Sequence, residues 1–278
     1  MADELQWMLI TASPGIAKYA ESCGVHRIFV DMEVLGKEER QKHLSAHKAA
    51  HTFEDITAVA GVLTKAELMV RVNPLYAETA QEVNESIACG ASRLMLPMFR
   101  SPEEVEEFIR LVDGRVPITF LAETPQALTR ISSYADILGK RDEVHFGLND
   151  LSLAMGLDFL FEPLAGRLLE PAIDELEKRG IAYGFGGVAR LDSGELPAEW
   201  VLSEHLRLRS RWVILSRAFH GGANELEELH SRIDLQDELH KLRSKERDLR
   251  NLDSQELLIN QEKLRKRVFE LARKGRSS

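Results

Sequence analysis

Eight short apolar runs, separated by segments with helical signals, constrain this chain more than any other feature. The runs are continuous rather than alternating in polarity and are rich in β-branched residues, as in parallel strands that are covered on both faces. They lie at 6–12, 27–33, 67–73, 93–99, 117–124, 143–150, 181–189 and 211–219. Eight strands that alternate with helices predict an α/β fold, a closed (β/α)₈ TIM barrel, for which 278 residues suffice. The rival is an open doubly wound sheet, and its dinucleotide-binding version is weakened because no G-x-G-x-x-G follows the first run.

Helix boundaries fit the same alternation. Ser101 is a predicted N-cap, Pro102 follows at the first helical position, and Glu103 and Glu104 place acidic groups in the first turn. Gly114 is then expected to end that helix before the next apolar run.

Composition excludes several classes of function. The net charge is −9, whereas a general nucleic-acid binder is usually basic, so we expect no nucleic-acid partner. No run of about 18 apolar residues is present, and the first residues lack the pattern of a signal peptide, so we expect no membrane association. Cys23 and Cys89 are far apart in the sequence and are interpreted as two buried thiols of a cytoplasmic protein.

The tail differs from the rest of the chain. We predict a barrel domain over 1–221 and a helical, coiled-coil-like extension over 222–278, with a break around 251–254. Two interpretations stand for this tail: an amphipathic segment that lies on its own barrel, or a helix that mediates homo-oligomer formation. Its apolar residues, spaced mostly by three, four or seven, are Leu226, Leu229, Ile233, Leu239, Leu242, Leu249, Leu252, Leu257, Leu264, Val268 and Leu271.

The carboxyl ends of the predicted strands identify candidate site residues, because barrel enzymes carry their active sites there. Glu123 and Asp150 end neighbouring strands, and two carboxylates on one rim repel each other unless a proton or a cation separates them. Oxygen ligands favour Mg²⁺ or Mn²⁺. The alternative for Asp150 is that it caps the following helix. The candidates at these ends are Asp31, Glu33, Arg71, Asn73, Glu123, Asn149, Asp150, Arg190, Ser216 and Arg217.

Arg71 lies inside an apolar run, and a buried arginine needs an anionic partner. One interpretation is a clamp for a substrate carboxylate. The other is an internal salt bridge to Asp31 or Glu33.

The motifs RIFVDME, VRVNP, GASRLMLPMFRSPEEVEEF, LAETPQAL and GLNDLSLAMG, in this order, resemble the HpcH/HpaI aldolase and citrate lyase β-subunit family. That family belongs to the phosphoenolpyruvate/pyruvate-binding superfamily of TIM barrels. The resemblance covers roughly 5–220, and the 27 residues from Glu123 to Asp150 are close to the separation of the family's two metal ligands.

The resemblance implies Mg²⁺ or Mn²⁺ on Glu123 and Asp150. It also implies that Arg71 binds the carboxylate of a pyruvate-like 2-oxo acid or stabilises its enolate, in carbon–carbon bond cleavage of the aldolase type. The acidic residues of the second strand, Asp31 and Glu33, are expected to take part in catalysis.

The sequence departs from the family pattern in two motifs. The aldolase branch has a histidine after the acidic residue of the second strand, where this chain has Val34. A glutamine often precedes the metal-binding glutamate by two residues, where this chain has Leu121. The citrate-lyase branch tends to have Asp-Leu-Glu-Asp in the second strand, where this chain has Asp-Met-Glu-Val. Neither branch's acid–base residues therefore carry over intact.

Another group could supply the missing proton transfer. His43, His47 and His51 are spaced by four residues and would lie on one helical face. One interpretation makes His51 the general acid or base, with Lys37 and Arg40 binding an anion. The alternative is a partly solvated helix face.

The last two strands add candidate substrate contacts. Glycines in GFGGVAR, Gly187 among them, would allow a ligand to approach the backbone, and Asn149 would also contact the substrate. Arg190 and Arg217 could neutralise an anionic group such as a sugar acid or a phosphorylated aldehyde. The alternative is that these two arginines pair with Glu204 and other acids at the rim.

Three functions follow from these features. The first is a metal-dependent carbon–carbon lyase acting on a 2-oxo acid or hydroxy acid. The second is an acyl-CoA lyase of the citrate-lyase type. The third is a non-catalytic barrel that binds an oxo acid and assembles through its helical tail.

Overall fold

The structure, a computed structural model, describes residues 4–36, 51–219 and 221–275. Strands and helices alternate along most of this length. The strands are β1 (Gln6–Ile10), β2 (Arg27–Asp31), β3 (Glu67–Arg71), β4 (Arg93–Leu96), β5 (Ile118–Ala122), β6 (Glu143–Phe146), β7 (Ala182–Val188) and β8 (Trp212–Leu215). The helices of the barrel are α1 (Pro14–Ser22), α3 (Phe53–Ala60), α4 (Thr79–Ala88), α5 (Pro102–Val112), α6 (Pro125–Thr129), α7 (Ile131–Tyr134), η1 (Ala135–Ile137), α8 (Leu148–Ala154), α9 (Glu162–Ala165), α10 (Glu170–Arg179), α11 (Ala198–Arg207) and η2 (Arg217–Phe219).

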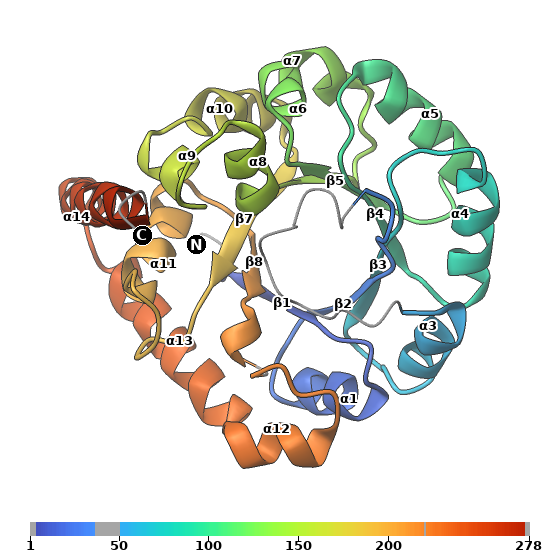
Figure 1. Ribbon diagram of the computed structural model, residues 1–278, viewed down its shortest axis with the longest axis horizontal. Helices are drawn as coiled ribbons and strands as arrows, with labels where there is room; N and C mark the ends of the chain where they lie inside the picture. Colours follow the sequence, from blue (N-terminus) through green and yellow to red (C-terminus); the bar gives the residue numbers. More distant parts are fainter. Residues whose placement is uncertain (1–3, 37–50, 220, 276–278) are drawn as a thin grey trace.

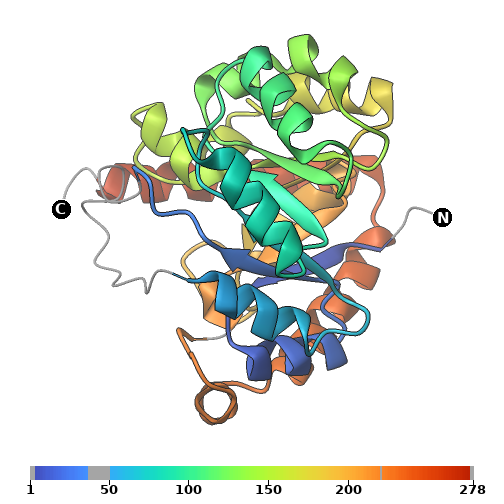
Figure 2. The same ribbon diagram turned by 90° about the vertical axis from the view of Figure 1, so that its right-hand side faces the viewer.

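The eight strands form a closed parallel barrel in sequence order, which confirms the predicted TIM barrel (Figure 1). The last strand closes on the first, with Trp7 opposite Val213 and Leu9 opposite Leu215. Figure 2, turned by 90°, shows the helices outside the strands. The carboxyl ends of all strands therefore lie on one rim.

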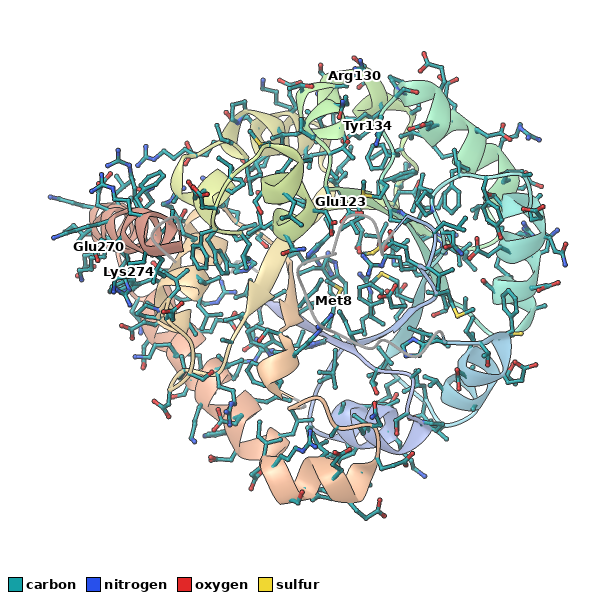
Figure 3. All side chains as sticks on the ribbon, in the orientation of Figure 1. Met8, Glu123, Arg130, Tyr134, Glu270 and Lys274 are labelled. Atoms are coloured by element: carbon teal, nitrogen blue, oxygen red, sulfur yellow. The ribbon has the colours of Figure 1, made fainter. Side chains whose placement is uncertain are left out.

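Side chains fill the barrel in layers along its axis. The middle layer is apolar and shields one end of the barrel from the other; Figure 3 labels Met8 within it. It consists of Met8, Phe29, Met69, Met95, Leu121 and Trp212. The interior is thus a packed core rather than a pore, and any substrate site must lie above this layer.

Helix α5 begins as the sequence predicts. Ser101 accepts a hydrogen bond from the backbone N–H of Glu104, and the Glu104 carboxylate accepts one from the Ser101 N–H, which completes a capping box. The helix ends at Val112, and Asp113 adopts a left-handed conformation before Gly114.

The tail forms three helices, α12 (Leu226–Arg232), α13 (Leu235–Arg250) and α14 (Ser254–Gly275), so the predicted break at 251–254 is confirmed. Glu246 of α13 accepts a hydrogen bond from the Leu5 N–H at 2.8 Å, which ties the tail to the start of β1. Helix α14 packs along α11 and α9. The division between a barrel at 1–221 and an extension at 222–278 stays a prediction.

Two further findings concern the cysteines and the apolarity of the helices. Cys23 and Cys89 are both free and only half-buried, so the expectation of buried thiols was wrong. No helix in the described ranges has the length and apolarity needed to cross a membrane.

Candidate active site

Arg71 lies at the end of β3, above the apolar layer, and is held by two acidic residues of the neighbouring β2 end. Its Nε and Nη2 donate to the two carboxylate oxygens of Asp31 at 2.9 and 2.8 Å, and its Nη1 lies 3.3 Å from Glu33 Oε2. Burial disfavours the charged guanidinium, but the charge and hydrogen bonds of Asp31 outweigh it and raise the pKa of Arg71. The internal salt bridge is therefore formed, and it fixes the plane of a permanently charged group at the rim.

The loop after β2 is positioned by a network that the sequence did not reveal. Asn73 Oδ1 accepts hydrogen bonds from the N–H groups of Val34 and Leu35, both at 2.9 Å. The Asn73 side-chain amide donates in turn to the buried carboxylate of Glu82, which lies on α4. Val34, the position of the family's histidine, is 49% exposed at this rim.

Glu123 directly follows β5 and is buried, with 2% of its surface exposed (Figure 3). Its Oε1 accepts a hydrogen bond from the Met98 N–H at 3.1 Å. Burial raises the pKa of Glu123 to about 8; Arg71 opposes this rise, whereas the charges of Asp150 and Glu33 add to it.

Two backbone features make room for Glu123. Met98 has a φ of 57°, an uncommon conformation for a residue with a side chain, and its N–H reaches the carboxylate in that conformation. Gly147 follows β6, and a Cβ there would lie 2.7 Å from Glu123 Cβ and 2.8 Å from Oε2. Any other residue at 147 would therefore displace the carboxylate.

Asp150 lies on α8, not at the end of a strand. Strand β6 ends at Phe146, and Asn149 and Asp150 occupy the first turn of the helix that begins at Leu148. This corrects the predicted strand end but keeps Asp150 on the rim beside Glu123, whose pKa it affects. The N-cap of α8 is Gly147, with no side-chain cap, so the prediction that Asp150 caps this helix was wrong.

Carboxylates at this rim are candidates for a metal site. Arg71 pairs with Asp31 and Glu33 and its charge also acts on Glu123, while Asp150 acts on Glu123 from α8. No cluster of three or more His, Cys, Asp or Glu side chains that could hold a metal occurs among the described residues. Glu123 and Asp150 could supply two carboxylate ligands, which would suit Mg²⁺ or Mn²⁺ with water or substrate oxygens in the other positions.

His51 contacts Asp31, but it does not lie on a helix. It precedes α3, which starts at Phe53, so the predicted helical placement was wrong. Its Nδ1 lies 2.9 Å from the backbone carbonyl oxygen of Asp31. A carbonyl only accepts, so Nδ1 carries the proton and Nε2 keeps a lone pair in the neutral ring. Lys37, Arg40, His43 and His47 lie outside the described residues.

The glycines of β7 serve the packing of the protein itself. A Cβ at Gly184 would lie 2.3 Å from the carbonyl oxygen of Trp212, and one at Gly186 would lie 2.7 Å from the Leu148 side chain. Packing against β8 and α8 is therefore sufficient to require these two glycines, and a ligand contact at this backbone stays a prediction. Gly187 is less crowded, with the Ile214 oxygen 3.3 Å from such a Cβ.

Arg190 and Arg217 follow β7 and β8 and do not pair with Glu204. That carboxylate is fully buried on α11 and accepts hydrogen bonds from Arg207 Nε and Nη2 at 2.7 and 2.8 Å. The predicted pairing was therefore wrong, because the i,i+3 partner on the same helix is nearer. The buried Nε of Arg190 has no hydrogen-bond partner in the described part of the chain.

Solved structures with the same fold come from several bacteria. An HpcH/HpaI aldolase from Desulfitobacterium hafniense DCB-2 aligns with a TM-score of 0.58 at 18% identity, over 77% of this chain and 86% of that one. An HpcH/HpaI aldolase/citrate lyase family protein from Burkholderia cenocepacia J2315 gives 0.59 at 16% identity, over 89% and 95%. RipC from Yersinia pestis gives 0.52 at 15% identity, over 83% and 95%. At these identities the likeness shows the fold alone.

The sequence comparisons go further than the fold. No curated protein matches the sequence. Residues 7–159, more than half of the chain, match the family described as HpcH/HpaI aldolase/citrate lyase. This stretch contains the Asp31–Arg71 pair, Glu123 and Asp150. The chain belongs to the HpcH/HpaI aldolase/citrate lyase family.

Proposed function

We propose that this protein is a metal-dependent carbon–carbon lyase of the aldolase type that acts on a 2-oxo acid or hydroxy acid. Membership in a family whose members are generally lyases supports the reaction class. The observation that carries the proposal is the buried carboxylate of Glu123, whose pKa is raised by burial and by the charges of Asp150 and Glu33. Glu123 and Asp150 would hold Mg²⁺ or Mn²⁺, which when bound supplies a Lewis acid for a 2-oxo group.

Arg71 binds and orients the anionic substrate. The Asp31 carboxylate accepts hydrogen bonds from Nε and one Nη of Arg71, so the guanidinium cannot rotate. The remaining N–H groups of Arg71 therefore keep a fixed direction. A fixed positive charge stabilises negative charge that develops on the substrate without reorganisation during the reaction. Asp31 and Glu33 thus position Arg71, and Glu33 is a further candidate for proton transfer.

His51 is the proposed general base or acid in place of the family's histidine. Its proton on Nδ1 is fixed by the Asp31 carbonyl, which leaves Nε2 able to accept a proton from a hydroxy acid and to return it. Asn149, Gly187, Arg190 and Arg217 are proposed substrate contacts, together with Lys37 and Arg40. The buried Nε of Arg190, which has no hydrogen-bond partner among the described residues, favours an anionic group, such as a sugar acid or a phosphorylated aldehyde, at the β7 side.

Metal binding and proton exchange test the proposal separately. Titration calorimetry with Mn²⁺ should show one site in the wild type, and Glu123→Gln and Asp150→Asn should weaken binding at least tenfold. Deuterium exchange at the pyruvate methyl group, followed by NMR with Mg²⁺ present, should be lost in both variants. Unchanged metal affinity in both carboxylate variants would refute the proposed metal site.

A test of the role of His51 requires a variant that keeps the hydrogen bond to the Asp31 carbonyl. In His51→Asn the side-chain amide can still donate toward the Asp31 carbonyl but cannot accept a proton at neutral pH. We expect exchange to fall at least 100-fold with metal affinity unchanged. If exchange stays at the wild-type rate, another group performs the proton transfer.

The half-exposed Val34 favours a second candidate function, a non-catalytic barrel that binds an oxo acid. It predicts that pyruvate binds in the presence of metal while no small 2-oxo acid exchanges its protons. For the acyl-CoA lyase alternative, the described residues offer no observation that favours it. We also propose that the protein is a homo-oligomer.

A further inference from the structure

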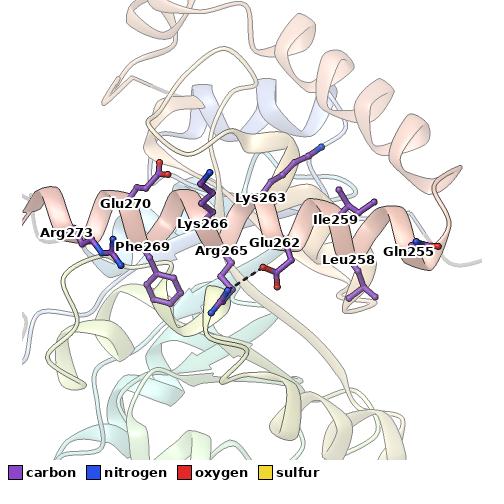
Figure 4. Close-up of a pocket in the computed structure, with 10 residues that line it drawn as sticks. All are labelled: Gln255, Leu258, Ile259, Glu262, Lys263, Arg265, Lys266, Phe269, Glu270 and Arg273. Carbon is purple, nitrogen blue, oxygen red and sulfur yellow. Dashed lines mark hydrogen bonds and ion pairs between the residues drawn. The ribbon is translucent and has the colours of Figure 1, made fainter.

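Helix α14 presents two different faces. One face packs against the barrel helices through the buried side chains of Gln261, Leu264 and Val268. On the opposite face, Leu258 and Ile259 are 43% and 50% exposed. Figure 4 shows that exposed face, with Leu258 on one edge and Ile259 on the other.

The exposed face carries a heptad seam. Six of its residues follow each other in alternating steps of four and three, which is the 3.5-residue period of a helix that packs against another helix. All six line a shallow groove along the helix. They are Gln255, Ile259, Glu262, Lys266, Phe269 and Arg273, and we call them the α14 seam.

The α14 seam is complementary to itself in the antiparallel direction. When a second, antiparallel α14 is related to the first by a two-fold axis that passes between Glu262 and Lys266, the Glu262 carboxylate of each copy faces the Lys266 ammonium group of the other. In the same register Ile259 faces Phe269 of the other copy. The terminal pair then sets Gln255 against Arg273. A parallel pair would instead place Glu262 against Glu262 and Lys266 against Lys266, which repel.

We propose that two copies of this chain associate through the α14 seam as an antiparallel helix pair. A two-fold axis requires one self-complementary patch, and the α14 seam meets that condition at all of its layers. The proposal is independent of the catalytic function, because α14 carries none of the candidate site residues.

Two features make this association weak and exchangeable. A single helix pair buries less than the roughly 1,200–2,000 Å² of a stable interface. Lys263 and Arg265 flank the axis and would face their own counterparts. Arg265 interacts with two residues of its own helix: its Nη1 lies 3.4 Å from Glu262 Oε2, and its Cζ lies 5.7 Å from the centroid of the Phe269 ring. These contacts moderate the repulsion.

Charge exchange on the full-length chain tests the pairing. Glu262→Lys and Lys266→Glu should each raise the dissociation constant of the dimer at least tenfold in sedimentation experiments. An equimolar mixture of the two variants should recover the wild-type value, because every ionic layer of the mixed dimer again joins opposite charges. The controls Glu106→Lys and Lys140→Glu make the same charge changes at exposed positions away from α14 and should have no effect.

Cysteine cross-linking tests the direction and does not depend on other assembly surfaces. A mixture of Ile259→Cys and Phe269→Cys chains should form a disulfide-linked dimer under mild oxidation, whereas either variant alone and the wild type should not. Cross-linking of Ile259→Cys with itself would indicate a parallel pair and overturn the proposal. Failure of the mixed charge variants to reassociate would overturn it as well.

Discussion

Both ends of the barrel interior carry arginines next to acidic residues, but the two ends differ in how these charges are paired. At the amino-terminal end, the fully buried Arg27 pairs with Glu67 at 2.6 Å and with Glu143, and Arg93 pairs with Glu67 at 3.0 Å. Thr119 adds a hydrogen bond to Glu143 at 2.7 Å. Two cations meet two anions there, and the charges cancel.

At the carboxyl end, Arg71 pairs with Asp31 and Glu33, and the buried Glu123 accepts a hydrogen bond from the Met98 N–H. The charges of the lower end compensate each other, so removing one of them leaves an uncompensated buried charge. At the upper end the raised pKa of Glu123 is the kind of perturbation expected at a functional site, and the general division of TIM barrels leads us to expect binding there.

The largest expected effect comes from breaking the balanced end. Glu143→Gln keeps an acceptor for Arg27 and Thr119 but removes the charge that compensates two buried guanidinium groups. We expect the free energy of unfolding to fall by about 3 kcal/mol. Urea denaturation of metal-free protein would measure it, and metal affinity of the folded variant should be unchanged.

The same chemical change at the upper end is the matched control. Glu123→Gln replaces a carboxyl group whose pKa of about 8 already keeps it mostly protonated at pH 7 without metal. The free energy of unfolding should therefore change by no more than about 1 kcal/mol, while metal binding is lost. Equal destabilisation by the two substitutions would refute the distinction between the two ends.

His145 lies between the two ends and makes the fold sensitive to acid. Burial lowers its pKa to about 4, and its Nδ1 has no hydrogen-bond partner among the described residues. The unfolded chain binds a proton near pH 6.5, so the stability from the neutral ring is complete above that pH and is lost as the pH falls toward 4.

The loss should approach about 3 kcal/mol at the acidic limit. We expect denaturation curves between pH 7 and pH 4.5 to show a weaker pH dependence for His145→Gln than for the wild type. His240→Gln, at an exposed position, should keep the wild-type slope. Identical slopes for the wild type and His145→Gln would show that the imidazole does not control acid stability.

The fold could be predicted because the sequence patterns that determine it recur along the chain and involve residues close together in the sequence. Eight continuous apolar runs require eight strands covered on both faces, and the capping box at Ser101 is contained within four residues. The rim positions of Glu123 and Asp150 followed from the order of the strands. The Glu204–Arg207 pair could also have been predicted from its i,i+3 spacing.

The supporting contacts of the site could not be predicted, because they join distant segments. Asn73 bridges the β2 loop to Glu82 on α4, and nothing in either sequence context indicates that pairing. The packing requirement for glycine at position 184 could not be predicted either, because the Trp212 carbonyl oxygen that it approaches comes from the next strand. The left-handed backbone of Met98 has no signal in a residue that rarely adopts it.

Met98 gives the most local test of the upper end. A β-branched residue tolerates a φ of 57° poorly, so Met98→Val should cost about 1–2 kcal/mol of stability, whereas Met98→Gly fits the same backbone without strain. Because the N–H of residue 98 holds Glu123, the valine variant should also bind Mn²⁺ several-fold more weakly than the glycine variant. Met155→Val makes the same change at an ordinary φ of −88° and should alter neither property. Equal metal affinity of the valine and glycine variants at residue 98 would mean that burial and Gly147, rather than the Met98 N–H, hold the Glu123 carboxylate in place.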